Sequence, residues 1–391
     1  MPPGYDRPGM RVVHVCGDLG LYGAENVVAL LMQHTHEPDV ELFAMTVNRS
    51  DHPEARERAG VPVIAIERNG RKDVGFIVRM VRALRRLRPD VVHTHGHHGR
   101  YWGRVAAILA RVPIVVHTEH NPDLRPPKPR AVFTALNRVL NPRTSAFVDF
   151  TPRRREELAQ AEAIPLDRIA VIPNGIPPVA QSAERRTRGR AGLGLADGEV
   201  GVVVVARLYP QKRIDLAIDA VAALPAPLRE RVRLVLFGDG PLREELEARA
   251  AAAGLAGQVR FLGFRADARD LLAGADVALL SSEREAMPLA IIEAMLDRIP
   301  IVSTPWAGAD AMLGGGRFGA VARAFSPAAL ADALRATIED PDAARERAAA
   351  AAAYASAEFD VSTQARRYAA LYRDVSARTR ATKSFITAAR S

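Results

Sequence analysis

Short runs of mostly Val and Ile alternate along nearly the whole chain with longer segments whose apolar residues recur at helical spacing. Segments 23–34 and 103–112 show this helical spacing. The short runs are predicted strands at 11–16, 40–47, 61–66, 90–95, 113–118, 146–150, 169–173, 200–207, 232–240, 259–263, 275–282 and 299–304. Because these runs are almost continuously apolar, both faces of each strand should be buried. This pattern favours parallel sheets covered by helices.

The strands fall into two series, separated by residues 174–194, which are rich in Pro, Gly and Arg. A chain of 391 residues can bury two separate cores. We predict a first domain over 1–178, a linker over 179–194 and a second domain over 195–360. An Ala-rich helical pair (327–356) and a last helix (about 361–377) follow, with a frayed tail after Thr379. Segment 361–391 is expected to pack on the first domain. The predicted fold class is α/β, with two doubly wound Rossmann-like domains facing each other across a cleft.

Composition narrows the class of protein. The hydrophobic fraction of 48% and the charged fraction of 25% are those of a soluble globular protein. No apolar run reaches the roughly 20 residues of a membrane span, and the first residues lack the build of a signal peptide. The single cysteine, Cys16, excludes an internal disulfide framework, so a cytoplasmic location is expected.

The net charge of +9 favours an anionic partner, and no sequence signature of a nucleic-acid-binding module is present. The run RMVRALRRLRP (79–89) places arginines on several faces of a predicted helix. A solvated helix face is the simple interpretation. Contact with anionic lipid at the inner face of the membrane is the alternative.

Three strand-to-helix turns carry candidate chemistry, because ligands of open α/β sheets bind beyond the carboxyl ends of the strands. The first is CGDLGLYGAEN (16–26), in which Gly20 and Gly23 let the backbone approach an anion at a helix start. A simple tight turn explains the same glycines equally well. The turn lacks the GxGxxG pattern, which argues against a dinucleotide cofactor.

The second turn is VVVVARLYPQKRID (202–215). Arg207 follows the predicted strand, and Lys212 stands where the next helix should begin. A guanidinium and an ammonium at this place suit a diphosphate. The alternative is that both side chains form salt bridges with neighbouring carboxylates.

The third turn is SSEREAMPLAIIEAM (281–295). Pro288 suits a first helical position, so Glu285 should lie in the loop and Glu293 inside the helix. Eight helical residues rise about 12 Å, comparable with the distance from a transferred sugar across a diphosphate to a ribose. We therefore expect one carboxylate for each sugar, with the phosphates between them.

These motifs together resemble a known family. Glu285-x7-Glu293, ARLYPQK, VIPNGI (171–176), FGDGP (237–241), FLGF (261–264) and YGAE (22–25) occur in the order found in family-four retaining glycosyltransferases of the GT-B fold. The resemblance extends from residue 11 to about 375. It implies an enzyme of hexosyltransferase type that uses a nucleotide sugar and needs neither cofactor nor metal. Glycan, polysaccharide or glycolipid biosynthesis is the implied setting, with an acceptor that is a glycan, a lipid-linked molecule or a small molecule.

The resemblance also implies roles for individual residues. The first domain would bind the acceptor and the second the donor. Glu285 would contact the donor sugar, Glu293 the ribose, and Arg207 and Lys212 the leaving diphosphate. The family's histidine near the transferred sugar maps to His120, with His117 as second choice. The implied catalytic residues are His120, Glu285, Arg207 and Lys212. The implied donor-binding residues are Gly23, Arg207, Lys212, Gly263, Glu285, Met287, Pro288, Leu289 and Glu293. The implied acceptor-side residues are Tyr22, His95, His97 and His117. The chain departs from the family pattern at Met287-Pro288, which replace Phe-Gly, and at Arg298, which replaces a glycine.

All ten histidines lie between residues 14 and 120, and HTHGHH (93–98) holds four of them. Alternating histidines can chelate zinc, but no cysteine or acidic ligand accompanies them locally, so no metal site is expected. His95, His97 and His98 are instead expected to line the acceptor side or to cap a helix that starts near Arg100.

The mechanism expected from these residues is transfer with retention, in which the cations and helix N–H groups stabilise the leaving diphosphate. Two other functions fit the same residues. A nucleotide-sugar 2-epimerase of the same fold would form an epimer without an acceptor, and a non-catalytic sugar-nucleotide-binding protein would show no turnover.

Overall fold

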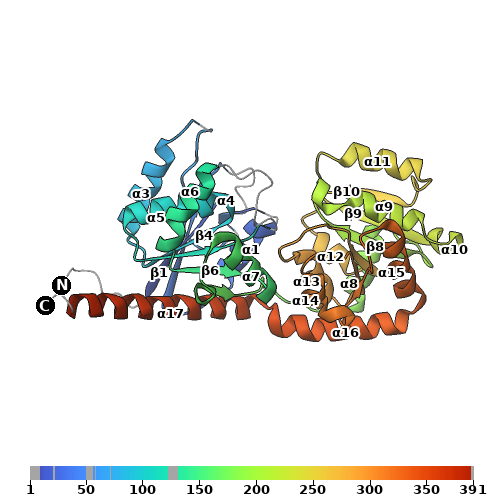
Figure 1. The fold of residues 1–391 in the computed structure, drawn as a ribbon. Helices are drawn as coiled ribbons and strands as arrows, with labels where there is room; N and C mark the ends of the chain where they lie inside the picture. The colour runs from blue at the N-terminus through green and yellow to red at the C-terminus, as the bar shows by residue number, and fades with distance from the viewer. Residues whose placement is uncertain are drawn as a thin grey trace. The chain divides into compact units, whose positions relative to one another are not determined.

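The computed structural model describes residues 9–20, 23–49, 56–57, 59–70, 72–121 and 131–388. The chain divides into two compact units (Figure 1). Residues 1–177 and 361–391 form the first, and residues 178–360 form the second. Each unit is described by itself.

The first unit is built on a parallel sheet of seven strands in the order β3-β2-β1-β4-β5-β6-β7. Its strands are β1 (Met10–Cys16), β2 (Val40–Thr46), β3 (Val63–Ala65), β4 (Val91–His95), β5 (Ile114–Thr118), β6 (Ala146–Asp149) and β7 (Ile169–Val171). Every strand of this sheet was expected from its Val- and Ile-rich run.

Helices cover both faces of this sheet. They are α1 (Gly23–Gln33), α3 (Gly75–Leu87), α4 (Gly96–His98), a π-helical turn (Gly99–Gly103), α5 (Arg104–Ala110), α6 (Ala131–Leu140), α7 (Pro152–Glu162) and α17 (Val361–Ala388), with 3₁₀ turns at Asn141–Arg143 and Leu166–Arg168. Side chains of α1 and α17 fill the core on one face, and those of α3 and α5 fill it on the other. Burial on both faces is the reason that the strands lack polar alternation.

The last helix, α17, belongs to the first unit, along which it runs in Figure 1. Tyr368 and Tyr372 lie in the core beside β4 and β5, and Arg373 forms ion pairs with Glu37 and Asp39. The expectation that the tail frays after Thr379 is wrong for the backbone, because the helix continues to Ala388.

The second unit holds a parallel sheet of six strands in the order β10-β9-β8-β11-β12-β13. Its strands are β8 (Val200–Val205), β9 (Val232–Phe237), β10 (Val259–Gly263), β11 (Val277–Leu280), β12 (Ile301–Ser303) and β13 (Ala320–Val321). The sequence did not predict β13. A strand of two residues is too short to produce a pattern of its own.

Helices also surround the second sheet. They are α8 (Ala183–Leu193), α9 (Ile214–Ala222), α10 (Ala226–Arg229), α11 (Arg243–Ala252), α12 (Ala268–Leu272), α13 (Leu289–Leu296), α14 (Ala309–Leu313), α15 (Pro327–Glu339) and α16 (Pro341–Glu358), with 3₁₀ turns at Pro210–Lys212 and Gly314–Gly316. The core contains side chains of β8, β9 and β11 packed against α9, α11 and α15. Helix α13 lies against β11 and β12, and α16 lies against α13.

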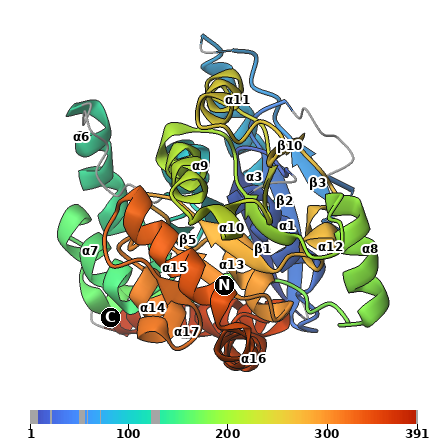
Figure 2. The ribbon, with the colours of Figure 1, turned by 90° about the vertical axis from the view of Figure 1, so that its right-hand side faces the viewer.

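The predicted linker over 179–194 is wrong for most of its length, because residues 183–193 form α8. Ser182 caps this helix by accepting the backbone N–H of Arg185 at 3.0 Å, and Gly194 ends it in a left-handed conformation. Helix α8 packs against α12, and the two lie next to each other in Figure 2. A Cβ atom on Gly189 would lie 2.6 Å from the backbone nitrogen of Gly274. At Gly189, glycine therefore allows close helix packing rather than flexibility.

Gly238 holds the loop after β9 against the end of β8. Its φ of +124° lies in a region that favours glycine, and an added Cβ atom would lie 2.1 Å from the carbonyl oxygen of Ala206. We expect Gly238→Ala to lower the free energy of unfolding by about 2 kcal/mol or more. Gly257→Ala is the control, because nothing lies within 4 Å of a Cβ atom there. Thermal unfolding of both variants checks this, and equal melting temperatures would contradict the packing argument.

Candidate active site

In the second unit, the order of the strands reverses between β8 and β11. Neighbouring strands β8 and β11 lead to opposite halves of the sheet, which is the place where open α/β sheets bind ligands. The loops that follow them are joined directly. The backbone N–H of Glu283 donates to the carbonyl of Gln211 at 3.0 Å, and the Ser281 hydroxyl donates to the carbonyl of Lys212 at 2.8 Å.

Lys212 and Glu285 meet at this position, one from each loop. The Lys212 ammonium lies 2.6 Å from a Glu285 carboxylate oxygen, and the two side chains are 19% and 9% exposed. A mostly buried ion pair of this kind keeps both charges in place. The salt bridge that the sequence left open as an alternative for Lys212 is therefore present, and its partner is the glutamate predicted to contact the donor sugar.

Backbone geometry explains where Lys212 stands. Leu208 is buried in the loop after β8, Pro210 opens a 3₁₀ turn, and Arg213 leaves that turn with a φ of +48°. The Arg213 side chain is held by Asp215 at 2.8 Å. Arg207 lies just after β8, with its guanidinium carbon 4.9 Å from the centre of the Tyr209 ring. Both predicted cations thus belong to the short segment between β8 and α9.

The loop after β11 is anchored by apolar side chains. Met287 and Pro288 are buried, and Leu289 is half-buried. Pro288 is the residue before the helix and not its first helical residue, since α13 begins at Leu289. The buried Met287 side chain occupies the position where the family pattern has Phe.

Glu293 lies within α13, further along the chain than Glu285 of the Lys212–Glu285 ion pair. It is half-buried, and burial raises its pKa to about 7; the Arg269 cation opposes this rise, and the Asp297 charge adds to it. The Nε and Nη2 atoms of Arg269 are buried and have no hydrogen-bond partner within the described part of the chain. Burial also lowers the pKa of Arg269, and the Glu293 and Asp297 charges oppose this. Across the described ranges, Glu293 forms no ion pair with Arg207 or Lys212.

Gly263 ends β10, two strands from β8. Its φ is +67°, and its carbonyl accepts the backbone N–H of Gly238 at 2.8 Å. Asp239 accepts the neighbouring N–H of Phe264 at 2.8 Å. The structure thus joins Gly263 to the glycine loop after β9.

The first unit has an equivalent strand reversal between β1 and β4. Gly23 is the first residue of α1, has a φ of +48°, and has open space where a Cβ atom would stand. Gly23 is exposed, and the approach of its backbone to an anion stays a prediction. Tyr22 lies outside the described residues.

The structure places the predicted histidines of the first unit in different surroundings. His95 ends β4 and lies 3.1 Å from His120, ring nitrogen to ring nitrogen. His97 is exposed, and its ring faces those of Tyr101 and Phe133. His117 is buried within β5, where its Nδ1 lies 2.9 Å from the Thr94 hydroxyl and its Nε2 lies 3.7 Å from Glu119. His117 is thus bound inside the core, whereas His120 is half-buried.

Sequence reasoning missed His14, which lies on β1 with its Nδ1 2.9 Å from Nε2 of His95. The two residues are 81 positions apart, so no local spacing connects them. It also missed the hydroxyl groups around His93. Nδ1 of His93 lies 2.7 Å from the Tyr372 hydroxyl, and its Nε2 lies 2.7 Å from the Thr118 hydroxyl.

Burial keeps these rings neutral. It lowers the pKa of His14 to about 3 and the pKa of His120 to about 4, and it holds the pKa values of His93 and His95 well below the ordinary range. Neutral imidazoles suit metal binding, and ring nitrogens of His14, His93 and His95 lie within 4.8 Å of one another. However, both nitrogens of His93 face hydroxyl groups, and His14 and His95 face each other. A bound metal would have to break these hydrogen bonds.

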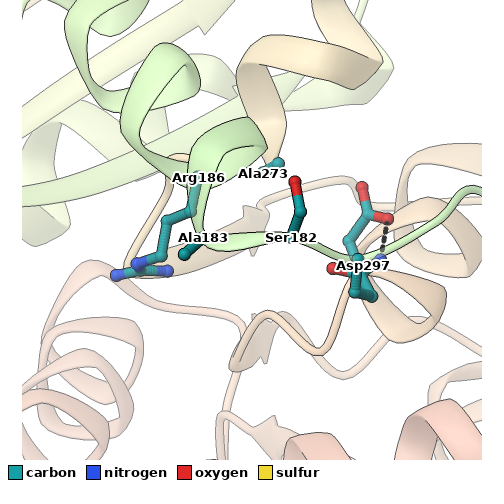
Figure 3. Close-up of a pocket in the computed structure, with 6 residues that line it drawn as sticks. Ser182, Ala183, Arg186, Ala273 and Asp297 are labelled. Carbon is teal, nitrogen blue, oxygen red and sulfur yellow. Dashed lines mark hydrogen bonds between the residues drawn. The ribbon is translucent and has the colours of Figure 1, made fainter.

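A pocket of about 330 Å³ lies at the opposite end of α13, where Gln181, Ser182, Arg186 and Asp297 line it (Figure 3). Asp297 is already paired with Arg185 at 3.0 Å and accepts the Gln181 amide at 2.8 Å. None of the predicted site residues lines this pocket.

Two family models match consecutive parts of the chain. "Glycosyltransferase Family 4" matches residues 22–179, and "Glycosyl transferases group 1" matches residues 186–355. The chain is 32% identical over 296 residues to D-inositol 3-phosphate glycosyltransferase of Xylanimonas cellulosilytica, which covers 69% of this chain and 68% of that protein. It is 27% identical over 324 residues to alpha-D-kanosaminyltransferase of Streptomyces kanamyceticus, covering 77% and 82% of the two chains.

Solved structures share the fold. Anabaena Alr3699/HepE in complex with UDP and glucose superposes with a TM-score of 0.81 at 24% identity, over 93% of this chain and 100% of that one. WaaG, a glycosyltransferase involved in lipopolysaccharide biosynthesis, gives a TM-score of 0.71 at 19% identity, over 92% and 99%. With two Rossmann-like sheets, both family models and a relative above 30% identity, the chain belongs to the family-four glycosyltransferases of the GT-B fold and is a nucleotide-sugar-dependent glycosyltransferase.

Proposed function

We propose that this enzyme transfers a hexosyl group from a nucleoside diphosphate sugar with retention of configuration, without a metal. The observation that carries the proposal is the Lys212–Glu285 pair at the strand reversal of the second unit. Departure of the diphosphate concentrates negative charge, and fixed cations that stabilise this charge accelerate the step. Lys212 is the cation of this pair, and Arg207 lies in the same segment between β8 and α9.

Glu285 has a double task in this proposal. In the free enzyme it holds Lys212 at 2.6 Å. When a diphosphate takes up part of the Lys212 charge, the carboxylate becomes free to accept hydroxyl groups of the donor sugar. Glu293, on the helix that follows, would accept the ribose hydroxyls, and its raised pKa makes that interaction sensitive to pH.

A donor panel tests the nucleotide and the reaction together. UDP-, GDP- and dTDP-sugars are each added to the folded enzyme, and the preferred donor should raise the melting temperature most, because it binds the folded state alone. We expect a UDP-sugar, since Anabaena Alr3699/HepE was solved with UDP-glucose. NMR of the product with acceptor should show the anomeric configuration of the donor, with activity undiminished by EDTA. Inversion at the anomeric carbon, or an epimer formed from the donor alone, would contradict the proposal.

For the acceptor, we propose a glycan or a lipid-linked molecule reached at an anionic membrane surface. In the described part of the chain, no helix is long and apolar enough to cross a bilayer. Helix α3 nevertheless exposes Val74 (77%) and Val78 (50%) together with Arg82, Arg85 and Arg86. Exposed apolar side chains beside arginines are typical of a helix that lies on anionic lipid.

Charge reversal on α3 tests the membrane contact. Each arginine near an anionic surface contributes about 1 kcal/mol, so Arg85→Glu with Arg86→Glu should weaken binding to phosphatidylglycerol-containing vesicles at least about tenfold. Vesicle sedimentation measures this, with neutral phosphatidylcholine vesicles as the comparison. Arg345→Glu, an exposed arginine of α16, is the control. Equal binding of all three proteins would leave α3 as a solvated face.

A further inference from the structure

Three histidines of the first unit form one continuous hydrogen-bonded chain. Nδ1 of His14 lies 2.9 Å from Nε2 of His95, and Nδ1 of His95 lies 3.1 Å from Nε2 of His120. The rings come from β1, from the end of β4 and from the residues that follow β5. His14 and His95 are buried, and His120 is half-buried, so the chain leads from the core toward the surface.

The chemistry of imidazole makes both hydrogen bonds of these three histidines run in the same direction. A neutral imidazole has one N–H donor and one bare nitrogen acceptor, and burial keeps all three rings neutral. If His95 donates from Nε2, it must accept at Nδ1, which requires Nε2–H on His120 and a bare Nδ1 on His14. If His95 donates from Nδ1, the protons lie on Nδ1 of all three rings. The three histidines therefore share one tautomer.

The tautomer shared by the three histidines decides whether His120 offers a hydrogen-bond donor or an acceptor. Its Nε2 is occupied by His95, so Nδ1 is its remaining ring nitrogen. That nitrogen is an acceptor when the protons lie on Nε2 throughout the chain, and a donor when they lie on Nδ1. His14, two rings away, thus controls the hydrogen bond that His120 can make.

The surroundings of the chain hold it in place. The planes of the His14 and His95 rings are nearly parallel, with an angle of 11°, and the His120 ring lies against Phe150. Besides burial, three titratable groups act on the pKa of His120: Glu119 raises it, and His117 and Arg154 lower it. Glu119 is itself paired with Arg100 at 2.5 Å. His120 therefore has a fixed ring position and a charge state set by burial.

We propose that His14 and His95 are positioning residues for glycosyl transfer, because their hydrogen bonds orient the His120 ring and tie its tautomer to their own. This inference rests on the proposed function and on the role that the family resemblance implies for His120, near the transferred sugar. The hydrogen-bonded chain of histidines does not depend on that function, so the histidine chain and the proposed function can be tested separately.

The tautomers are measured first, in the unmodified enzyme. Long-range ¹H–¹⁵N correlation spectra of ¹⁵N-histidine-labelled protein report which ring nitrogen carries the proton, and single-histidine variants assign the signals. We expect His14, His95 and His120 to be neutral and to carry their protons on the same-named nitrogen. Mixed tautomers among the three would overturn the chain, as would one equivalent of zinc bound through their nitrogens.

Two variants at His14 then test the link to catalysis. His14→Phe keeps a ring but removes Nδ1, whereas the amide of His14→Asn places a polar atom near the position of Nδ1 and can keep the bond to His95. We expect kcat to fall at least about tenfold in His14→Phe with the donor KM changed less than about twofold, because a misplaced group costs turnover more than binding. His14→Asn should recover most of the lost kcat and keep the His120 tautomer.

The outcomes separate the two proposals. Unchanged kcat in a folded His14→Phe protein would overturn the positioning role. Equal losses in His14→Phe and His14→Asn would also overturn it, since a defect of packing alone would then explain both. If Lys212→Met retains full activity while the shared tautomer is found, the proposed diphosphate site fails and the histidine chain stands.

Discussion

Lys212→Met is expected to lower kcat by about 10²- to 10³-fold, the loss typical of removing one group that stabilises charge in a transition state. The methionine keeps much of the side-chain length but leaves the developing charge on the diphosphate without this cation. Steady-state kinetics with the preferred donor measure the loss. A kcat within about threefold of the wild-type value would place the diphosphate elsewhere.

The same substitution should also destabilise the second unit, because it leaves the Glu285 carboxylate without its ion-pair partner. The Glu285 side chain is only 9% exposed. We expect a loss of about 1–3 kcal/mol in the free energy of unfolding. Adding Glu285→Gln removes the stranded charge and should recover stability without recovering kcat. This contrast separates a catalytic cation from a structural one.

Arg249→Met is the matched control for the ion pair. Arg249 pairs with Asp219 at 2.5 Å in the same unit, but these side chains are more exposed than those of Lys212 and Glu285, at 44% and 28%. Removing an exposed pair changes stability by roughly 1 kcal/mol or less, and kcat should not change.

The second large effect is expected from pH. Burial raises the pKa of Glu293 to about 7, so this carboxyl is mostly protonated at pH 6 and mostly ionised at pH 8. An ionised carboxylate accepts hydroxyl hydrogen bonds more strongly. The donor KM should therefore rise as pH falls through about 7, and Glu293→Gln should show a high, nearly constant KM between pH 6 and 8. A KM for the wild-type enzyme that does not change over this range would contradict the assignment of the ribose to Glu293.

Glu293 also links stability to pH, in a direction opposite to the usual behaviour of carboxyl groups. The raised pKa means that the folded state holds the proton more tightly than the unfolded state between about pH 4.5 and 7. Stability should therefore decrease as pH rises through this window and level off above it. Glu293→Gln should remove a penalty of roughly 3 kcal/mol in the free energy of unfolding at pH 8 and little at pH 4.5, which urea unfolding at the two pH values can measure.

Much of the fold could be predicted from the sequence, because parallel strands buried on both faces appear as continuous apolar runs. The failures have physical causes. β13 has two residues, too few for a pattern. Helix α8 was mistaken for a linker because residues 174–194 are rich in Pro, Gly and Arg. In the fold, one of these glycines, Gly189, permits a close backbone contact with Gly274.

The candidate site, like the fold, could be predicted from the sequence only in part. Lys212 and Glu285 were expected from strand ends, and the topology brings them to adjacent loops because β8 and β11 are neighbours. The His14–His95 bond and the tyrosines around His93 were not accessible from the sequence. They join positions 81 and 279 residues apart, and only the assembled sheet with α17 on its face brings them together.

Residues 361–391 belong to the first unit although they follow the second unit in the sequence, and this order affects folding during translation. Tyr368 and Tyr372 complete the core around β4 and β5, yet they are translated after the entire second unit. The newly made first unit cannot complete this core until α17 has emerged from the ribosome, whereas the second unit is continuous in the sequence. We therefore expect residues 178–360 to become protease-resistant on the ribosome before the portion that precedes them, reversing the N-to-C order in which nascent domains generally mature.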